Sequence, residues 1–397
     1  AEERPFIVPE SDEPAAAKGV RWARWDRLSN LFVGDKGIWI VTFALMLISI
    51  IVVFSAVSQE AFRAENSGQD FFGQILKHLI LVVCALGIIV LGSHVPSSYY
   101  LRSSTIAFIF SLILLMLVPF IGIEINGGKR WLKIFFLTFQ PSELLKLSFI
   151  VTFAYHLQKV EENLNQPGVL IPVLCHAAAP VLLIMLQGDH GSAIVFLFIA
   201  CGMLFSAGLA WKYILTAGGL TIAALPVIWY GLMDEDKLMR FITLFNPDLD
   251  PTGSGYQQRL GRIALGSGKL WGKGIFSGNH QYVPEMYNDF IFSFIGEALG
   301  FIGCLAVLGI ISALCLRVLQ VGRRAKDRLG RFICVGVFSM IAAQTVMNVG
   351  MCLSVLPVIG VTLPLFSGGG TSVVATYLGI GLAMSVSMHN SRKLFTL

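Results

Sequence analysis

The stretch IWIVTFALMLISIIVVFSAV, residues 38–57, decides the fold class of this chain, because none of its residues carries a charge. A helix rises 1.5 Å per residue, so about 20 helical residues cross the ~30 Å hydrocarbon core of a bilayer. A surface helix of a soluble protein would show a polar face over such a length. The stretch therefore predicts a transmembrane helix.

Apolar runs of this kind recur along the chain. The sequence is 55% hydrophobic and 13% charged, with a mean hydropathy of +0.74, whereas a soluble domain carries about 25% charged residues. We therefore predict an all-α polytopic membrane protein of about ten transmembrane helices. The predicted spans are Ile38–Val57, Ile75–His94, Ser104–Ile123, Leu144–Leu157, Val169–Leu186, Ser192–Leu209, Tyr213–Tyr230, Phe290–Leu316, Phe332–Val355 and Leu365–Met388.

Lys and Arg set the predicted orientation, because they gather on the cytoplasmic side of a membrane protein. One cluster precedes the first span, a second follows the eighth and a third follows the last. With ten spans all three clusters lie on one side, so both termini are predicted to be cytoplasmic. The clusters are Arg21, Arg24, Arg27 and Lys36; then Arg317, Arg323, Arg324, Lys326, Arg328 and Arg331; and then Arg392 and Lys393.

This orientation divides the chain into a cytoplasmic tail of residues 1–36, a transmembrane domain of residues 37–390 and a cytoplasmic tail of residues 391–397. Trp22, Trp25 and the arginines near them fit an interfacial helix in the first tail, and they fit a basic linker equally well. One long connection, residues 231–289, is predicted to lie outside the cytoplasm. Loops of that length are uncommon unless they are functional or disordered.

Several cations fall on the outward side, where short loops normally avoid them. Such a cluster indicates an anionic ligand at the outer leaflet, such as a pyrophosphate. Our candidates for holding it are Lys129, Arg130, Arg240 and Lys273. The alternative is that long loops cross the membrane regardless of their charge. The net charge of +5 does not by itself indicate nucleic acid.

Two acids mark the eighth span. Asp289 stands at its mouth, and Glu297 follows eight residues later, on about the same helical face and two turns deeper. An acid inside a membrane span is a functional candidate by default. The alternatives are a helix-start carboxylate for Asp289, favoured by the helix dipole, and an interhelical hydrogen bond for Glu297.

Three further patterns have both a local and a functional interpretation. Glu143 and Lys146 are spaced for a local ion pair at the start of the fourth span. Asp189 and His190 fit a turn at an outer boundary, and a single histidine is weak evidence for a metal. The glycines of residues 266–274 lack the spacing of a nucleotide-binding loop, and they predict close backbone packing or an anion nest.

An ordered series of short motifs resembles the SEDS proteins (shape, elongation, division and sporulation), the family of RodA, FtsW and SpoVE. The resemblance runs from about Gly34 to the C-terminus, and the stretch of residues 34–39 with its basic tail looks closest to FtsW-like members of the Bacteroidetes. The chain departs from the family pattern at residues 286–288, at His190 and at Ala298. The matching stretches are Asn126–Trp131, Phe139–Glu143, Gly255–Gln258, Ala264–Gly268, Gly272–Gly274, Pro284–Glu285, Asp289–Phe292, Gly296–Glu297, Leu299–Gly300, Leu356–Val358 and Leu363–Pro364.

The resemblance implies a peptidoglycan glycosyltransferase that polymerises lipid II at the outer face of the bacterial cytoplasmic membrane. It places the essential aspartate of the family on Asp289. One base suffices for this chemistry, because pyrophosphate leaves without a second acid. No ligand set for Mg²⁺ or Mn²⁺ is evident in the sequence, and a bound ion of either kind stays open. The substrate-binding candidates are Lys129, Arg130, Trp131, Glu143, Lys146, Arg240, Gln258, Lys273 and Glu297.

The family also implies partners: a class B penicillin-binding protein that crosslinks the strands, and membrane proteins of the division or elongation machinery. Two other functions remain open at this point. A flippase for lipid-linked precursors explains the spans and the intramembrane acids, but we see no inverted repeat. A non-catalytic scaffold for cell-wall assembly predicts that Asp289 tolerates substitution.

Overall fold

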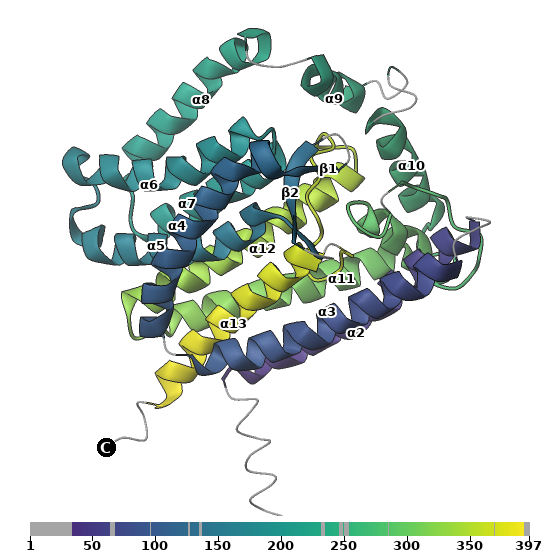
Figure 1. Cartoon of the computed structure of the whole chain (residues 1–397), viewed down its shortest axis with the longest axis horizontal. Coiled ribbons are helices and arrows are strands. Elements are labelled where there is room, and N and C mark those ends of the chain that lie inside the picture. Colours follow the sequence, from purple (N-terminus) through teal and green to yellow (C-terminus); the bar gives the residue numbers. More distant parts are fainter. Residues whose placement is uncertain are drawn as a thin grey trace, which may run out of the picture.

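The computed structural model describes residues 34–63, 68–95, 97–125, 128–134, 137–231, 235–245, 249, 254–284, 286–368 and 370–392. The interfacial helix expected near Trp22 and Trp25 lies outside these residues. Long helices form most of the described chain (Figure 1). The helices are α2 (Lys36–Arg63), α3 (Gly68–His94), α4 (Ser97–Ile121), α5 (Pro141–Val160), α6 (Pro167–Leu186), α7 (His190–Ser206), α8 (Trp211–Gly231), α9 (Glu235–Phe245), α10 (Ser254–Ser267), α11 (Ile291–Arg323), α12 (Arg328–Cys352) and α13 (Gly370–Arg392), with a 3₁₀ turn at Glu161–Asn163.

The predicted apolar runs coincide with long helices, with some shifts at their ends. The last run was predicted from Leu365, but α13 begins only at Gly370, because Leu365 has a φ of 70° and residues around it form turns. By length and apolar composition, α2, α4, α6, α11, α12 and α13 are six described helices that can cross a membrane. The count of ten spans stays a prediction.

An all-helical chain is the wrong prediction for residues 123–139. Strands β1 (Ile123–Ile125), β2 (Gly128–Ile134) and β3 (Leu137–Phe139) form an antiparallel sheet between α4 and α5. Short β-branched and aromatic segments pair this way because the ladder satisfies their backbone groups. A search for runs of spanning length overlooks strands this short.

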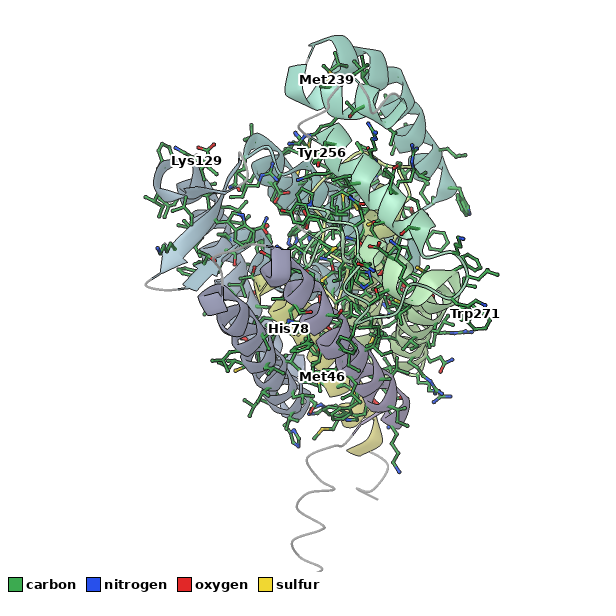
Figure 2. The ribbon with its side chains drawn as sticks, turned by 90° about the vertical axis from the view of Figure 1, so that its right-hand side faces the viewer. Met46, His78, Lys129, Met239, Tyr256 and Trp271 are labelled. Atoms are coloured by element: carbon green, nitrogen blue, oxygen red, sulfur yellow. The ribbon has the colours of Figure 1, made fainter. Side chains whose placement is uncertain are left out.

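Helix α12 occupies the middle of the bundle and packs against α5, α7, α11 and α13. The outer faces of the helices are apolar instead of charged, as Ile171 on α6 and Leu305 on α11 show with exposed fractions of 61% and 53%. Exposed apolar surface of this extent is rare on soluble monomers and is what a lipid environment requires. Figure 2 shows Lys129, Tyr256 and Met239 towards one end of the molecule, with Met46 and His78 further down the bundle.

Helix α11 is broken at Gly300, where φ is 69°. The segment of residues 268–274 docks there backbone to backbone, so that a side chain on Gly300 would clash with Gly272 N and Leu270 O. The N–H of Phe301, left open by the break, donates to Lys269 O over 2.9 Å. Gly268 and Gly272 therefore serve close backbone packing, one of the two roles predicted for the glycines of residues 266–274.

Candidate functional site

Asp289 lies in the turn directly before α11, and its side chain is half-buried. Asn348, fully buried on α12, holds this turn in place through hydrogen bonds. Its Nδ2 donates to Asp289 O over 2.7 Å and to Val361 O over 2.8 Å. A single amide thus fixes the Asp289 turn to α12 and to the residues that follow α12, which preorganises the position of the carboxylate.

The residues after α12, 353–368, form the second wall around Asp289, and we call them the 353–368 segment. Gly360 has a φ of 66°, and a Cβ built on it would lie 3.7 Å from Asp289 Oδ2. The same segment also passes close to the start of α7, where a Cβ on Gly191 would clash with Ile359 O. Two glycines therefore let the segment pass closely between α7 and the Asp289 carboxylate.

Two other predicted site residues contact the same segment. Arg240 of α9 donates from Nη1 to Val358 O over 3.4 Å, and Gln258 of α10 donates from Nε2 to Leu356 O over 2.9 Å. Arg240 is exposed, whereas Gln258 is buried. The structure therefore brings Arg240, Gln258 and Asp289 together around one segment, although they lie on three elements of the long connection.

Arg130 reaches this region from the sheet. It is the extra residue of a β-bulge in β2, because Ile123 pairs with Trp131 while Glu124 pairs with Lys129. A bulge re-aims a side chain, and Arg130 donates from Nη2 to Gly188 O over 2.7 Å. Its Nη1 lies 3.7 Å from Asp189 Oδ1.

Asp189 is buried and is the N-cap of α7, with Oδ1 accepting from Ser192 N over 3.2 Å. Gln140 Nε2 donates to its other oxygen over 2.7 Å. The turn interpretation of Asp189 is thus confirmed, and this capped turn ties Arg130 to the helix end that carries Gly191. The described contacts do not join Lys129, which is exposed, or Trp131, which is half-buried, to this group.

Glu143 and Lys146 form the predicted local pair, with Lys146 Nζ 2.7 Å from Glu143 Oε1. The pair is buried, with exposed fractions of 7% for Glu143 and 1% for Lys146. Glu143 Oε2 is buried without a hydrogen-bond partner among the described residues. An unmet acceptor at this depth is costly, so this oxygen is available to a ligand donor.

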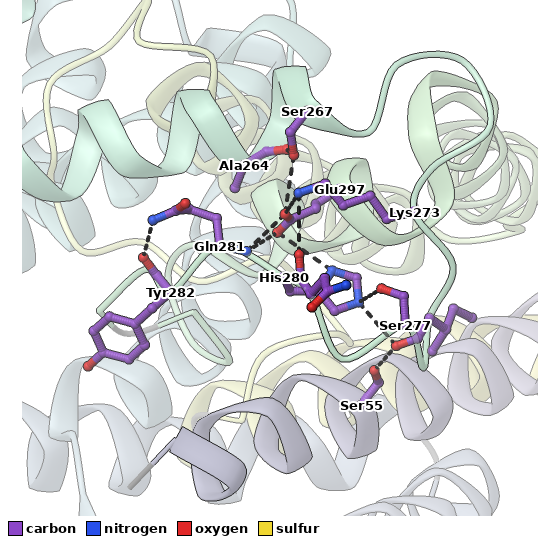
Figure 3. Close-up of polar contacts among 11 residues, drawn as sticks. Ser55, Ala264, Ser267, Lys273, Ser277, His280, Gln281, Tyr282 and Glu297 are labelled. Carbon is purple, nitrogen blue, oxygen red and sulfur yellow. Dashed lines mark hydrogen bonds and ion pairs between the residues drawn. The ribbon is translucent and has the colours of Figure 1, made fainter.

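Glu297 and Lys273 bind each other (Figure 3). Lys273 Nζ lies 2.5 Å from Glu297 Oε1, and Gln281 N donates to both carboxylate oxygens over 2.9 and 3.0 Å. Ser267 Oγ and His280 Nδ1 approach the same fully buried carboxylate within 3.2 and 3.6 Å. Glu297 therefore organises the connection between α10 and α11, which is the structural alternative. Its role and that of Lys273 towards substrate stay predictions.

Asp289 precedes the first residue of α11, so the predicted shared helical face with Glu297 does not arise, and the two acids contact different segments. Sequence reasoning missed Asn348, although a buried amide in an apolar run was a usable signal. Within the described ranges, no group of three or more His, Cys, Asp and Glu side chains could hold a metal ion. Mg²⁺ is commonly held by one or two carboxylates together with substrate phosphates, so a bound Mg²⁺ or Mn²⁺ stays open.

Comparisons with known proteins agree with this architecture. The chain is 31% identical over 370 residues to the peptidoglycan glycosyltransferase MrdB of Escherichia coli strain K12, covering 92% of this chain and 95% of MrdB. It is 32% identical to the probable peptidoglycan glycosyltransferase FtsW of Haemophilus influenzae, covering 92% and 93% of the two chains. A relative named MrdB and a relative named FtsW therefore match this chain about equally well.

Two solved structures share the fold. One is a chain described under the words "Structural coordination of polymerization and crosslinking by a peptidoglycan synthase complex". It has a TM-score of 0.74 and 26% identity, with 92% of this chain and 100% of that chain covered. The rod shape determining protein RodA of Thermus thermophilus has a TM-score of 0.66 and 27% identity, with 91% and 98% covered. The model of the FtsW/RodA/SpoVE family, described as cell cycle protein, matches residues 35–392, and the chain therefore belongs to this family.

Proposed function

We propose that this chain is a peptidoglycan glycosyltransferase that polymerises lipid II at the outer face of the bacterial cytoplasmic membrane. The observation that carries the proposal is the position of Asp289. Asn348 hydrogen-bonds to the backbone of its turn, and Gly360 lies next to its carboxylate. The names of the relatives support the same class of reaction.

In the proposed reaction Asp289 is the general base. Its carboxylate takes the proton from the 4-hydroxyl of the acceptor sugar while that oxygen attacks the anomeric carbon of the donor. The bond from that carbon to the lipid pyrophosphate breaks, and the configuration inverts. Because pyrophosphate takes both bonding electrons as a stable anion, no second acid is needed.

The leaving group instead needs positive charge, and two cations stand near the 353–368 segment. Arg240 contacts the segment itself, and Arg130 is tied to the turn that precedes Gly191. Preorganised donors of this kind stabilise developing charge without reorganisation. The buried Glu143 and Lys146 pair adds a free carboxylate oxygen for a sugar hydroxyl or amide donor.

The test is polymerisation of labelled lipid II by purified protein. Asp289→Asn keeps the shape and removes the base, so the rate should fall on the order of 10²–10⁴-fold. Arg323→Gln at the predicted cytoplasmic end is the matched surface control and should leave the rate unchanged. Wild-type polymerisation by a folded Asp289→Asn protein would remove Asp289 from the mechanism. Lipid II crossing vesicle membranes without glycan formation would favour the flippase alternative.

The proposed protein partner is a class B penicillin-binding protein, because uncrosslinked strands need a transpeptidase nearby. A solved relative described as part of a peptidoglycan synthase complex supports this. Lateral contact through lipid-facing helices would join the two proteins. Co-purification from the native membrane tests the partnership, and the transpeptidase recovered decides between division and elongation.

A further inference from the structure

An open cavity of about 420 Å³ is lined by residues of α4, α5 and α6 and by none of the residues around Asp289. These three helices lie on the left of Figure 1. Its lining includes Thr152, Tyr155, His156 and Lys159 of α5 and His176 of α6. The volume lies in the range of small-molecule sites, which run from roughly 300 to 1,000 Å³. Two histidines and a lysine inside a lipid-facing region are expensive to keep there unless they serve a ligand.

The cavity belongs to the cytoplasmic half of the membrane in the predicted orientation. Helix α5 runs inward from Pro141 to Val160, so Lys159 is in its last turn and His156 about one turn above it. His176 is nine residues into α6, which places it roughly 13 Å from the cytoplasmic start of that helix. The polar side chains thus extend from the head-group level into the inner leaflet.

The two imidazoles form a chain of hydrogen bonds. Thr152 Oγ1 donates to Ser148 O over 2.8 Å, so it can only accept from His176 Nε2, which lies 3.4 Å away. His176 Nδ1 is then an acceptor, and His156 Nδ1, 3.1 Å from it, carries the hydrogen. The Nε2 atom of a neutral His156 is left as an acceptor, which suits a ligand hydroxyl.

Lys159 supplies a positive charge at the cytoplasmic rim. Its Nζ lies 4.2 Å from the centre of the Tyr155 ring. The acids that follow it, Glu161 and Glu162, are paired with arginines of α12. No carboxylate of the described residues forms an ion pair with Lys159. Its charge is therefore available to an anion at the membrane surface.

We infer that this cavity binds the head group of an anionic phospholipid from the cytoplasmic leaflet. Lys159 pairs with the phosphate, and His156 Nε2 accepts from a head-group hydroxyl, as in phosphatidylglycerol. The acyl chains run over the exposed apolar face of α6 at Ile171 and Leu174. Basic pockets between helices on the cytoplasmic side are a known way to select anionic lipids.

The test uses the full-length protein in phosphatidylcholine nanodiscs that contain a photoactivatable phosphatidylglycerol or phosphatidylethanolamine. After illumination, mass spectrometry maps crosslinks to peptides. Crosslinks of phosphatidylglycerol to α5 and α6 should exceed those of phosphatidylethanolamine about five-fold, the factor that one lysine near a membrane surface supplies. His156→Phe should lower the yield while keeping an aromatic ring in place.

Lys159→Gln should abolish the preference, and because Lys159 is exposed at a helix end this variant should fold. The matched control is Lys212→Gln, since Lys212 lies over the Tyr213 ring in the same way, near the same membrane face, but outside the cavity. Crosslinks that ignore the head group, that map only to other helices, or that fall equally in both lysine variants would overturn the inference. The readout is independent of polymerisation, so its failure leaves the proposed function standing.

Discussion

Replacing Asn348 by leucine tests whether the Asp289 turn must be held from α12. The substitution keeps the side-chain volume and removes two hydrogen bonds, to Asp289 O and to Val361 O. Each such bond is worth about 1 kcal/mol net, and each buried carbonyl left unmet costs about 1–3 kcal/mol. Because Asn348 is fully buried and two carbonyls lose their donor, we expect the free energy of unfolding to fall by about 2–6 kcal/mol.

The effect on catalysis should be measurable separately from the effect on folding. Released from its clamp, the turn shifts, and a misplacement of about 1 Å at a reacting group costs on the order of 10²-fold in rate. The assay is polymerisation of labelled lipid II at a temperature where the variant is folded, with unfolding in detergent followed in parallel. The polymerisation rate of Asn348→Leu is compared with that of Asp289→Asn, which gives the lowest rate expected when the base is lost.

Gln344→Leu is the matched control. Gln344 lies one turn earlier on α12 and is 2% exposed, and its Oε1 has no hydrogen-bond partner among the described residues. Removing a buried amide oxygen that is already unmet should be neutral or stabilising. If Asn348→Leu polymerises at the wild-type rate, or if both variants lose activity equally, the clamp has no specific role and the argument fails.

Two other substitutions test the remaining contacts. Glu297→Gln leaves Lys273 without its charged partner and should lower the free energy of unfolding by about 3–5 kcal/mol. The control is Glu161→Gln, which weakens a more exposed ion pair and should lower it by about 1 kcal/mol or less. Equal losses of stability in chemical denaturation would contradict the buried role of Glu297. Arg130→Lys should slow lipid II polymerisation without unfolding the protein, because lysine lacks the forked guanidinium that reaches Gly188 O and Asp189 together. The control is Lys133→Gln, at an exposed position on the same strand, which should leave the polymerisation rate unchanged. Equal polymerisation rates for the two variants would remove Arg130 from the site.

The sequence predicted the helices well, because apolar runs of spanning length report a lipid environment directly. It could not predict the sheet of residues 123–139, because strands this short produce no apolar run of recognisable length. It also could not predict the β-bulge that orients the Arg130 side chain. The start of α13 was also missed, because the apolar composition of Leu365 and Phe366 continues while the backbone leaves the helical region.

The candidate site was predictable residue by residue but not as an arrangement. Arg240, Gln258 and Asp289 were all named from the sequence, yet only the fold shows that they meet the 353–368 segment. Conversely, Glu297 and Lys273 were named as substrate contacts, and the fold shows that they bind each other. Pairing between distant segments depends on packing, which a single sequence does not display.

The docking of Gly272 against Gly300 has a consequence for how this protein can evolve. A side chain at either position pushes the two backbones apart, and once they have separated the second position is released from the same clash. Both glycines also have a positive φ, 79° at Gly272 and 69° at Gly300, so each substitution adds its own backbone strain. Only the clash is shared, and the two effects should therefore add less than fully. A single substitution of either glycine should strongly destabilise the fold, so we expect relatives to keep both glycines or to have replaced both.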